Sequence, residues 1–223
     1  VFALVEQSRV INLSRIDVAS GKVTPLTTGP RYDAGFAVSK QGRIVVLGGD
    51  DVTPYELAAL ENGGLRPLGL HNEWLARKKL VRFDDIRFRS ADGTTIDGFV
   101  VKPPDYVPGR RYPTILRIHG GPVYQFSHEF MADWQAYAAR GFVVVAANPR
   151  GSSGRGFEFA KAIYADWGNK DVQDVLAEFA PDAEGDIAYL CGNPNMVDAA
   201  FEALKTAGLP VPHIRREKYV SSK

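Results

Sequence analysis

Residues 142–147, Phe-Val-Val-Val-Ala-Ala, are an uninterrupted apolar run that constrains the fold more than any other segment. A strand without polar alternation is typical of a parallel sheet covered by helices on both faces. A short apolar strand at 114–118 precedes it, and helical spacing at 130–139 stops at Gly141, a signal that ends helices. This order of strand, helix and strand predicts an α/β layer architecture.

The alternation continues toward the end of the sequence, and a hairpin signal, Ala91-Asp92-Gly93, comes before it. The further elements predicted by the same patterns are strands at 83–89 and 95–101, a mostly helical segment at 156–179 broken near 168–169, a strand at 187–191, a helix at 196–207 and a strand at 214–220.

The first 80 residues have a different pattern, because short strands rich in β-branched residues alternate with turns that contain glycine. A spacing of roughly ten residues between strands is typical of a sandwich, a barrel or a propeller. The strands are too few to close a full propeller. They are predicted at 1–6, 10–16, 23–27, 35–39, 43–47, 55–61 and 65–70.

The composition excludes several classes of protein. A net charge of +1 gives no general attraction to nucleic acid or to an anionic membrane, and no apolar run reaches the ~18 residues of a membrane span. The single cysteine excludes a disulfide framework, and the four histidines have no metal-ligand spacing. No signal peptide opens the sequence, which predicts a cytoplasmic location. Because the first residue is Val1, we also expect a fragment whose start is missing.

Five stretches of the sequence together resemble the prolyl oligopeptidase family of serine peptidases, in its acylaminoacyl-peptidase and dipeptidyl-peptidase-like branch. They are Ser90-Ala91-Asp92-Gly93-Thr94, Tyr112-Pro113, His119-Gly120-Gly121-Pro122, residues 148–156 (Asn-Pro-Arg-Gly-Ser-Ser-Gly-Arg-Gly), and Asp166-Trp167-Gly168 followed by Asp171 and Asp174. The resemblance covers residues 1–177. It implies the last blades of an incomplete β-propeller at 1–80, the first half of an α/β-hydrolase sheet at 81–180, a peptide substrate and no cofactor.

The His-Gly-Gly sequence at 119–121 is the candidate oxyanion loop. Backbone N–H groups that follow a strand can face a developing oxyanion, and glycine permits close approach and a positive φ. The family resemblance favours this role for His119, Gly120 and Gly121, by analogy with the hydrolase loop after the third strand. An ordinary strand-to-loop turn stays open as the alternative.

Two other motifs are interpreted as structural. The loop at 150–156 has neither Gly-x-Gly-x-x-Gly nor the Lys-Ser/Thr ending of a phosphate-binding loop. Ser152 and Ser153 do not fit Gly-x-Ser-x-Gly either, since Arg155 stands two residues after Ser153. Asp166-Trp167-Gly168 predicts a buried tryptophan at a helix break.

The nucleophile elbow of the family, Gly-x-Ser-x-Gly, is not found after the next predicted strand. The strand at 187–191 leads into Gly192-Asn193-Pro194-Asn195-Met196, in which Asn193 stands near the position of the nucleophile. An amide cannot form an acyl-enzyme. His213 is the one later histidine and comes too soon after the elbow to complete a triad. The sequence therefore predicts little or no peptidase activity.

Residues 182–220 resemble a second family, the carboxyl end of flavin-dependent ferredoxin and oxygenase reductases. The resemblance rests on Cys-Gly-Asn-Pro-x-Met at 191–196 and on Glu-Lys-Tyr at 217–219. It implies that NAD(P)H binds at Cys191, Gly192, Asn193, Pro194 and Met196, with a flavin near the terminal aromatic residue. The flavin-binding barrel and the glycine-rich turn of that family are missing, which favours Cys191 as a small buried strand residue.

Three hypotheses stay open. The chain is a serine-peptidase relative without its nucleophile, an electron-transfer module that binds NAD(P)H, or a non-functional hybrid or truncated chain joined near residues 178–182, with 181–223 as a reductase-like tail. The oligomeric state and the substrate are not predicted by the sequence.

Overall fold

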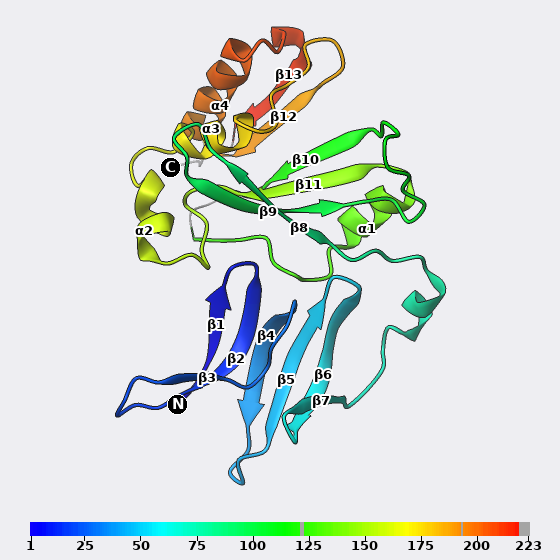
Figure 1. Ribbon diagram of the computed structural model, residues 1–223, viewed down its shortest axis with the longest axis vertical. Coiled ribbons are helices and arrows are strands. Elements are labelled where there is room, and N and C mark those ends of the chain that lie inside the picture. Colours follow the sequence, from blue (N-terminus) through cyan, green and yellow to red (C-terminus); the bar gives the residue numbers. More distant parts are fainter. Residues whose placement is uncertain (121–122, 193, 219–223) are drawn as a thin grey trace. The chain divides into compact units, whose positions relative to one another are not determined.

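The structure is a computed structural model and describes residues 1–120, 123–192 and 194–218. These residues gather into two compact units (Figure 1). One unit comprises Val1–Asp85, Gly98–Arg117 and Gln125–Ala146, and the other comprises Ile86–Asp97, Ile118–Tyr124 and Ala147–Lys223. The division between a propeller part at 1–80 and a hydrolase part at 81–180 stays a prediction.

The first seven strands form one sheet in the first unit, in the order β1-β2-β4-β5-β6-β7, with β3 paired to β2 (Figure 1, blue to cyan). Neighbours pair antiparallel except for β2 and β4, which meet in parallel at one residue pair. In chain order the strands are β1 (Phe2–Gln7), β2 (Val10–Ile16), β3 (Val23–Pro25), β4 (Tyr32–Val38), β5 (Ile44–Asp50), β6 (Thr53–Glu61) and β7 (Gly64–Pro67).

The turns of this sheet have the chemistry that the sequence predicted. Between β2 and β3 the Asp17 carboxylate accepts hydrogen bonds from the backbone N–H and the hydroxyl of Ser20, at 2.8 and 2.7 Å. Between β6 and β7, Asn62 and Gly63 both have positive φ, 52° and 76°, as a two-residue hairpin turn of this hand requires. In the described residues β1–β7 make an open sheet and not a closed propeller, so the propeller stays a prediction.

Asp33 in β4 is a buried carboxylate that accepts three hydrogen bonds within the sheet. It is fully buried and accepts hydrogen bonds from the Leu13 backbone N–H at 3.0 Å, the Thr27 hydroxyl, and Nε of Arg31 at 2.7 Å. Gly48 in β5 packs directly on this carboxylate, because a Cβ at position 48 would stand 2.6 Å from Oδ1 of Asp33. A buried carboxylate thus joins β2, β4 and the segment between them.

A second buried polar cluster of the first unit surrounds His128. Its Nδ1 lies 2.9 Å from a carboxylate oxygen of Asp51, and its Nε2 lies 3.3 Å from Asp85. Nε of Arg9 lies 2.9 Å from the same Asp85 oxygen, and the backbone N–H of His128 donates to the Arg9 carbonyl at 2.8 Å. The side chain of Gln135 bonds the backbone of Asp51 and of Val81. These contacts tie the first sheet to the segment that leads into α1.

The second sheet has four strands in the order β10-β11-β9-β8, namely β8 (Asp84–Arg89), β9 (Thr95–Val101), β10 (Thr114–Ile118) and β11 (Val143–Asn148). The apolar run that predicted a buried strand is β11, in which the residues from Val144 to Asn148 are all buried. The neighbouring starts of β10 and β11 are joined by a hydrogen bond from the Val143 N–H to the Pro113 carbonyl, at 2.9 Å.

An aromatic core fills the first unit. Trp134 of α1 (Ala132–Ala139) and Phe99 of β9 are fully buried, and the rings of Phe83 and Phe126 contact Trp134 at centroid distances of 5.1 and 5.0 Å. Burial of such rings contributes about 2–3 kcal/mol each. The short 3₁₀ helix η1 (Glu73–Arg77), which the sequence did not predict, precedes β8 and buries Leu75.

The segment predicted as a broken helix is α2 (Phe157–Ala160), η2 (Lys161–Ile163) and α3 (Lys170–Leu176). The break falls at 164–169 and includes Gly168, with φ +86°. After it, β12 (Ala188–Gly192) and β13 (Ile214–Lys218) pair in parallel, connected by α4 (Pro194–Thr206) and η3 (Val211–His213). Figure 1 shows α4 beside this pair, and Phe201 of α4 packs with Leu209 and Ile214. The two strands make a sheet of their own and do not extend the four-stranded sheet.

Candidate functional site

The predicted oxyanion loop begins at His119, directly after β10 ends at Ile118. The loop that follows β11 begins at Pro149, and the two loops contact each other. Nε2 of His119 lies 2.9 Å from Oγ of Ser152. Both strands therefore start together and end together, so β10 and β11 run parallel, as the sequence pattern predicted. In open parallel sheets, ligands bind at the carboxyl ends of the strands.

The hydrogen bond between His119 and Ser152 has a defined direction. The Ser152 hydroxyl is fully buried and donates its single proton to the Pro149 carbonyl, at 2.6 Å. Its oxygen is consequently the acceptor toward His119. This oxygen accepts from His119 only when the ring carries its proton on Nε2.

This direction decides against a catalytic dyad. A serine and a histidine 2.9 Å apart have the spacing of a nucleophile and its base, but a base must accept the serine proton. Here the Ser152 proton is held by Pro149, and the hydroxyl is sealed from solvent. Ser152 is thus a structural residue, in agreement with the interpretation of the loop at 150–156.

Burial lowers the pKa of the His119 imidazole to about 4, while hydrogen bonds with the Gly120 backbone and the Asn148 side chain act in the opposite direction. The ring is therefore neutral at pH 7. It also meets the ring of Tyr124 edge to face, at a centroid distance of 5.3 Å. A neutral, half-buried imidazole can serve as a hydrogen-bond donor.

This depressed pKa predicts acid destabilisation. Between pH 6.5 and 4 the unfolded chain binds a proton at His119 that the folded protein does not, so folding becomes less favourable as the pH falls. We expect His119 to cost up to about 3 kcal/mol of stability across this window. The measurement is urea unfolding at pH 7, 5.5 and 4 for the wild type and for His119→Gln, which does not titrate. Parallel pH profiles for the two proteins would contradict the prediction.

Two backbone hydrogen bonds add to the contact between the loops. The Val123 N–H donates to the Gly151 carbonyl at 2.9 Å, and the Ser153 N–H donates to the Tyr124 carbonyl at 3.1 Å. Val123 has φ +66°, which is an outlier for a β-branched residue. Such strain costs about 1–3 kcal/mol and clusters at functional sites.

Gly120 has no structural need to be glycine. Its φ lies outside the left-handed region, and no atom of the described residues stands within 4 Å of the place where a Cβ would be. Of the two properties that glycine permits, a positive φ and close approach, Gly120 does not use the first. A bare backbone at an open position leaves room for close approach by something other than the described protein. Gly121 and Pro122 lie outside the described residues.

Arg150 organises the base of the second loop. Its guanidinium contacts the fully buried Asp174 of α3 through Nε and Nη2, the latter at 2.6 Å, and its backbone N–H donates to the same carboxylate at 2.9 Å. Nη1 also pairs with Asp92. The pKa of the Asp92 carboxyl is lowered to about 2, first by hydrogen bonds from Thr94 and then by Arg150. The sequence identified these residues as motif members but not their pairing.

The Asp166-Trp167-Gly168 turn departs from its prediction. Trp167 is 40% exposed, so the expectation of a buried tryptophan is wrong. Gly168 is the buried residue of the turn, because a Cβ there would stand 2.5 Å from Cβ of Ala199 in α4. Its N–H donates to Asp171 at 2.9 Å. Burial raises the pKa of the Asp171 carboxyl, against the opposing effect of its backbone hydrogen bonds.

The predicted cofactor-binding residues lie at the turn between β12 and α4. Cys191 and Gly192 end β12, with Cys191 opposite Glu217 of β13, and Pro194 begins α4. Asn193 lies outside the described residues. Met196 is half-buried, and its Cα stands 3.3 Å from the Cβ position of Gly168. The start of α4 thus packs on the Asp166-Trp167-Gly168 turn, a contact that the reductase interpretation does not use.

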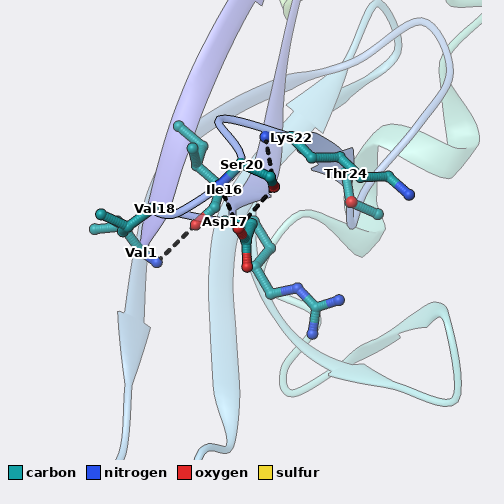
Figure 2. A pocket seen from close by; sticks show the side chains of 8 residues that line it. Val1, Ile16, Asp17, Val18, Ser20, Lys22 and Thr24 are labelled. Carbon is teal, nitrogen blue, oxygen red and sulfur yellow. Dashed lines mark hydrogen bonds between the residues drawn. The ribbon is translucent and has the colours of Figure 1, made fainter.

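Other features of the described residues add no second site. Residues 1–120, 123–192 and 194–218 hold no group of three or more metal-ligating side chains and no helix long and apolar enough to cross a membrane. A hollow of about 550 Å³ lies at the end of β2 and the turn after it (Figure 2). Its polar groups bond one another, since the Val1 amino group donates to the Ile16 carbonyl and Ser20 donates to Asp17.

Known proteins share these loops and strands. The sequence profile of the prolyl oligopeptidase family matches residues 128–180. An uncharacterized peptidase of Bacillus subtilis, YuxL, is 34% identical over 166 residues, which are 70% of this chain and 24% of the relative. The chain is similar to members of the prolyl oligopeptidase family. Another relative, the dipeptidyl-peptidase 5 of Schizosaccharomyces pombe, is 34% identical over 95 residues, 42% of this chain and 14% of that protein.

Solved structures extend the prolyl oligopeptidase likeness to most of the fold. The acylaminoacyl peptidase of Pyrococcus horikoshii superimposes with a TM-score of 0.75 at 27% identity, over 90% of this chain and 33% of that chain. An acylaminoacyl peptidase in complex with Z-Gly-Gly-Phe-chloromethyl ketone gives the same values. A puromycin-hydrolyzing peptidase of Mycobacterium tuberculosis, at 21% identity, shares the fold with a TM-score of 0.62. The chain spans about a quarter of the Bacillus relative and a third of the archaeal enzyme.

These matches bear on the second family that the sequence suggested. A superposition that covers 90% of the chain extends beyond residue 180, so the peptidase fold accommodates at least part of the segment with β12, α4 and β13. The reductase resemblance of residues 182–220, and with it NAD(P)H and flavin, receives no support from the matches. Nor does a junction between two proteins. Peptidases of the prolyl oligopeptidase family need no cofactor.

Proposed function

We propose that this chain contributes the oxyanion loop of a serine peptidase that acts on short peptides. In this role the backbone N–H group of Gly120 faces the oxygen of the scissile carbonyl as it gains charge during acyl transfer, and Gly121, the other candidate donor, lies outside the described residues. Preorganised donors of this kind contribute about 3–4 kcal/mol to transition-state stabilisation. His119 is the anchor of the loop and not its acid or base.

The observation that carries the proposal is a bare backbone held in place next to the carboxyl ends of β10 and β11. Gly120 meets open space, and the loop on either side of it is tied to the 149–153 segment at His119 and at Val123. A site that stabilises charge without reorganising needs rigid donors and room for the substrate. The open space beside Gly120 and the contacts at His119 and Val123 support the proposal.

We propose further that the 223-residue chain has no peptidase activity by itself. Its sequence contains no Gly-x-Ser-x-Gly, and the turn after β12 holds Asn193 where the family has its nucleophile. Ser152, whose hydroxyl lies 2.9 Å from Nε2 of His119, is buried and its proton is bonded to Pro149. On this reasoning neither Asn193 nor Ser152 forms an acyl-enzyme.

The test is labelling with a fluorophosphonate, which reacts with activated serines. We expect no labelling of the chain and no hydrolysis of dipeptidyl or N-acylaminoacyl chromogenic substrates above the rate with heat-denatured protein. The variant Ser152→Ala is the matched control for the buried pair. Stoichiometric labelling of the wild type would overturn the proposal of inactivity, and loss of that labelling in Ser152→Ala would identify Ser152 as the nucleophile.

A further inference from the structure

The Ser152 hydroxyl bonds a residue of its own loop, Pro149, and a residue of the neighbouring loop, His119. Ser152 lies on the 149–153 segment, which contacts the 119–124 segment at three places: His119 with Ser152, Val123 with Gly151, and Tyr124 with Ser153. The first of these is the one contact of the three made by side chains. The other two are backbone hydrogen bonds, which survive substitution of either side chain.

The Ser152 hydroxyl connects the Pro149 backbone to the imidazole of His119. Its proton is fixed by the Pro149 carbonyl, its oxygen accepts from Nε2 of His119, and the residue is completely buried. A hydroxyl with a committed proton distinguishes the two neutral tautomers of histidine, because only the Nε2–H form can donate to it. The contact of Nε2 with the Ser152 oxygen therefore favours one ring orientation and one tautomer of His119.

We propose that Ser152 is a positioning residue for the oxyanion loop, fixing His119 as the Nε2–H tautomer and thereby holding the backbone that leads to Gly120. The inference rests on the proposed function for its catalytic meaning, although the hydrogen-bond relay itself does not. Two observations beyond the relay agree with it. The strained Val123 on the far side of the loop needs a rigid surround, and His119 is wedged edge to face against Tyr124.

The first test uses the wild-type chain labelled with ¹⁵N-histidine. The imidazole nitrogens of His119, assigned by their loss in His119→Gln, are expected at pH 7 to show a protonated Nε2 and an unprotonated Nδ1. An Nδ1–H tautomer, an equal mixture of the two, or a charged ring would overturn the proposal. This measurement is made on a protein in which the hydrogen bond between His119 and Ser152 is intact.

The second test compares Ser152→Ala with Ser14→Ala, a buried serine in β2. In Ser152→Ala the preference of His119 for the Nε2–H tautomer is expected to fall. The Val123 amide should exchange with deuterium about tenfold faster, because the hydrogen bond between His119 and Ser152, which helps to hold the two loops together, is lost. Ser14→Ala should leave both readouts unchanged, because Ser14 belongs to neither the 119–124 nor the 149–153 segment. Equal effects of the two variants would overturn the assignment of the role to Ser152.

These readouts are independent of catalysis. If the fluorophosphonate labels the wild-type chain while the Nε2–H tautomer responds only to Ser152→Ala, the proposed inactivity fails and the positioning role stands. If the chain is not labelled and the tautomer does not respond, the positioning role fails and the proposed function stands.

Discussion

Replacing Asp174 with alanine is expected to lower the free energy of unfolding by about 3–5 kcal/mol, because it leaves a buried guanidinium without its main partner. Asp174 is fully buried, the Arg150 side chain is 10% exposed, and the carboxylate also accepts the Arg150 backbone N–H. The remaining partner, Asp92, is half exposed and holds one edge of the guanidinium. The measurement is urea unfolding at pH 7 followed by circular dichroism.

The matched control is Asp198→Ala in the same unit. Asp198 of α4 pairs with Arg216 of β13 at 3.4 Å, but both side chains are about half exposed. An exposed pair contributes less than about 1 kcal/mol. Equal losses for the two alanine variants would mean that burial of Arg150 and Asp174 does not control their contribution.

Replacing Asp33 with alanine is expected to destabilise the first sheet by about 3 kcal/mol, since three donors lose their shared acceptor inside the protein. The donors are the Leu13 N–H, the Thr27 hydroxyl and the Arg31 side chain. Asp33→Asn should recover part of the loss, because it keeps an acceptor oxygen but not the charge that pairs with Arg31. The measurement is the urea midpoint of each variant at pH 7.

Asp17→Ala serves as the control for Asp33, since both are aspartates that accept several hydrogen bonds in the same sheet. Asp17 is exposed and bonds the turn residue Ser20, which lowers the pKa of its carboxyl. Its loss should lower the urea midpoint much less than the loss of Asp33 does, because water replaces the missing partner. A larger effect at Asp17 than at Asp33 would refute the role assigned to burial.

Local sequence patterns predicted the strands with few errors. The bounds of β2, β9 and β10 agree with the predicted ranges, because each run of β-branched or apolar residues is closed by turn residues on both sides. β4 begins three residues before its prediction, at Tyr32, since the long-range contacts of Asp33 extend the strand past a polar start. The 3₁₀ helix at Glu73–Arg77 has no periodic signal at all.

The candidate site was only partly predictable. His119 and Gly120 follow from the His-Gly-Gly motif, but the contact of His119 with Ser152 joins residues 33 positions apart, and no local pattern encodes such a pair. The same holds for Arg150 and Asp174. The Asp-Trp-Gly motif at a helix break predicts a buried tryptophan, whereas the fold exposes Trp167 and buries the adjacent glycine. Tertiary packing decides what these motifs do.

The packing of Gly168 on α4 couples two positions that are distant in the sequence. A methyl group at position 168 would collide with the one already present on Ala199, and the φ of +86° independently disfavours every L-amino acid with a side chain. Glycine at position 199 would remove the collision but not the backbone strain. Substitution of Gly168 is therefore limited both by the volume of Ala199 and by the left-handed backbone conformation. A smaller residue at position 199 relaxes the first limit, but no change at position 199 relaxes the second.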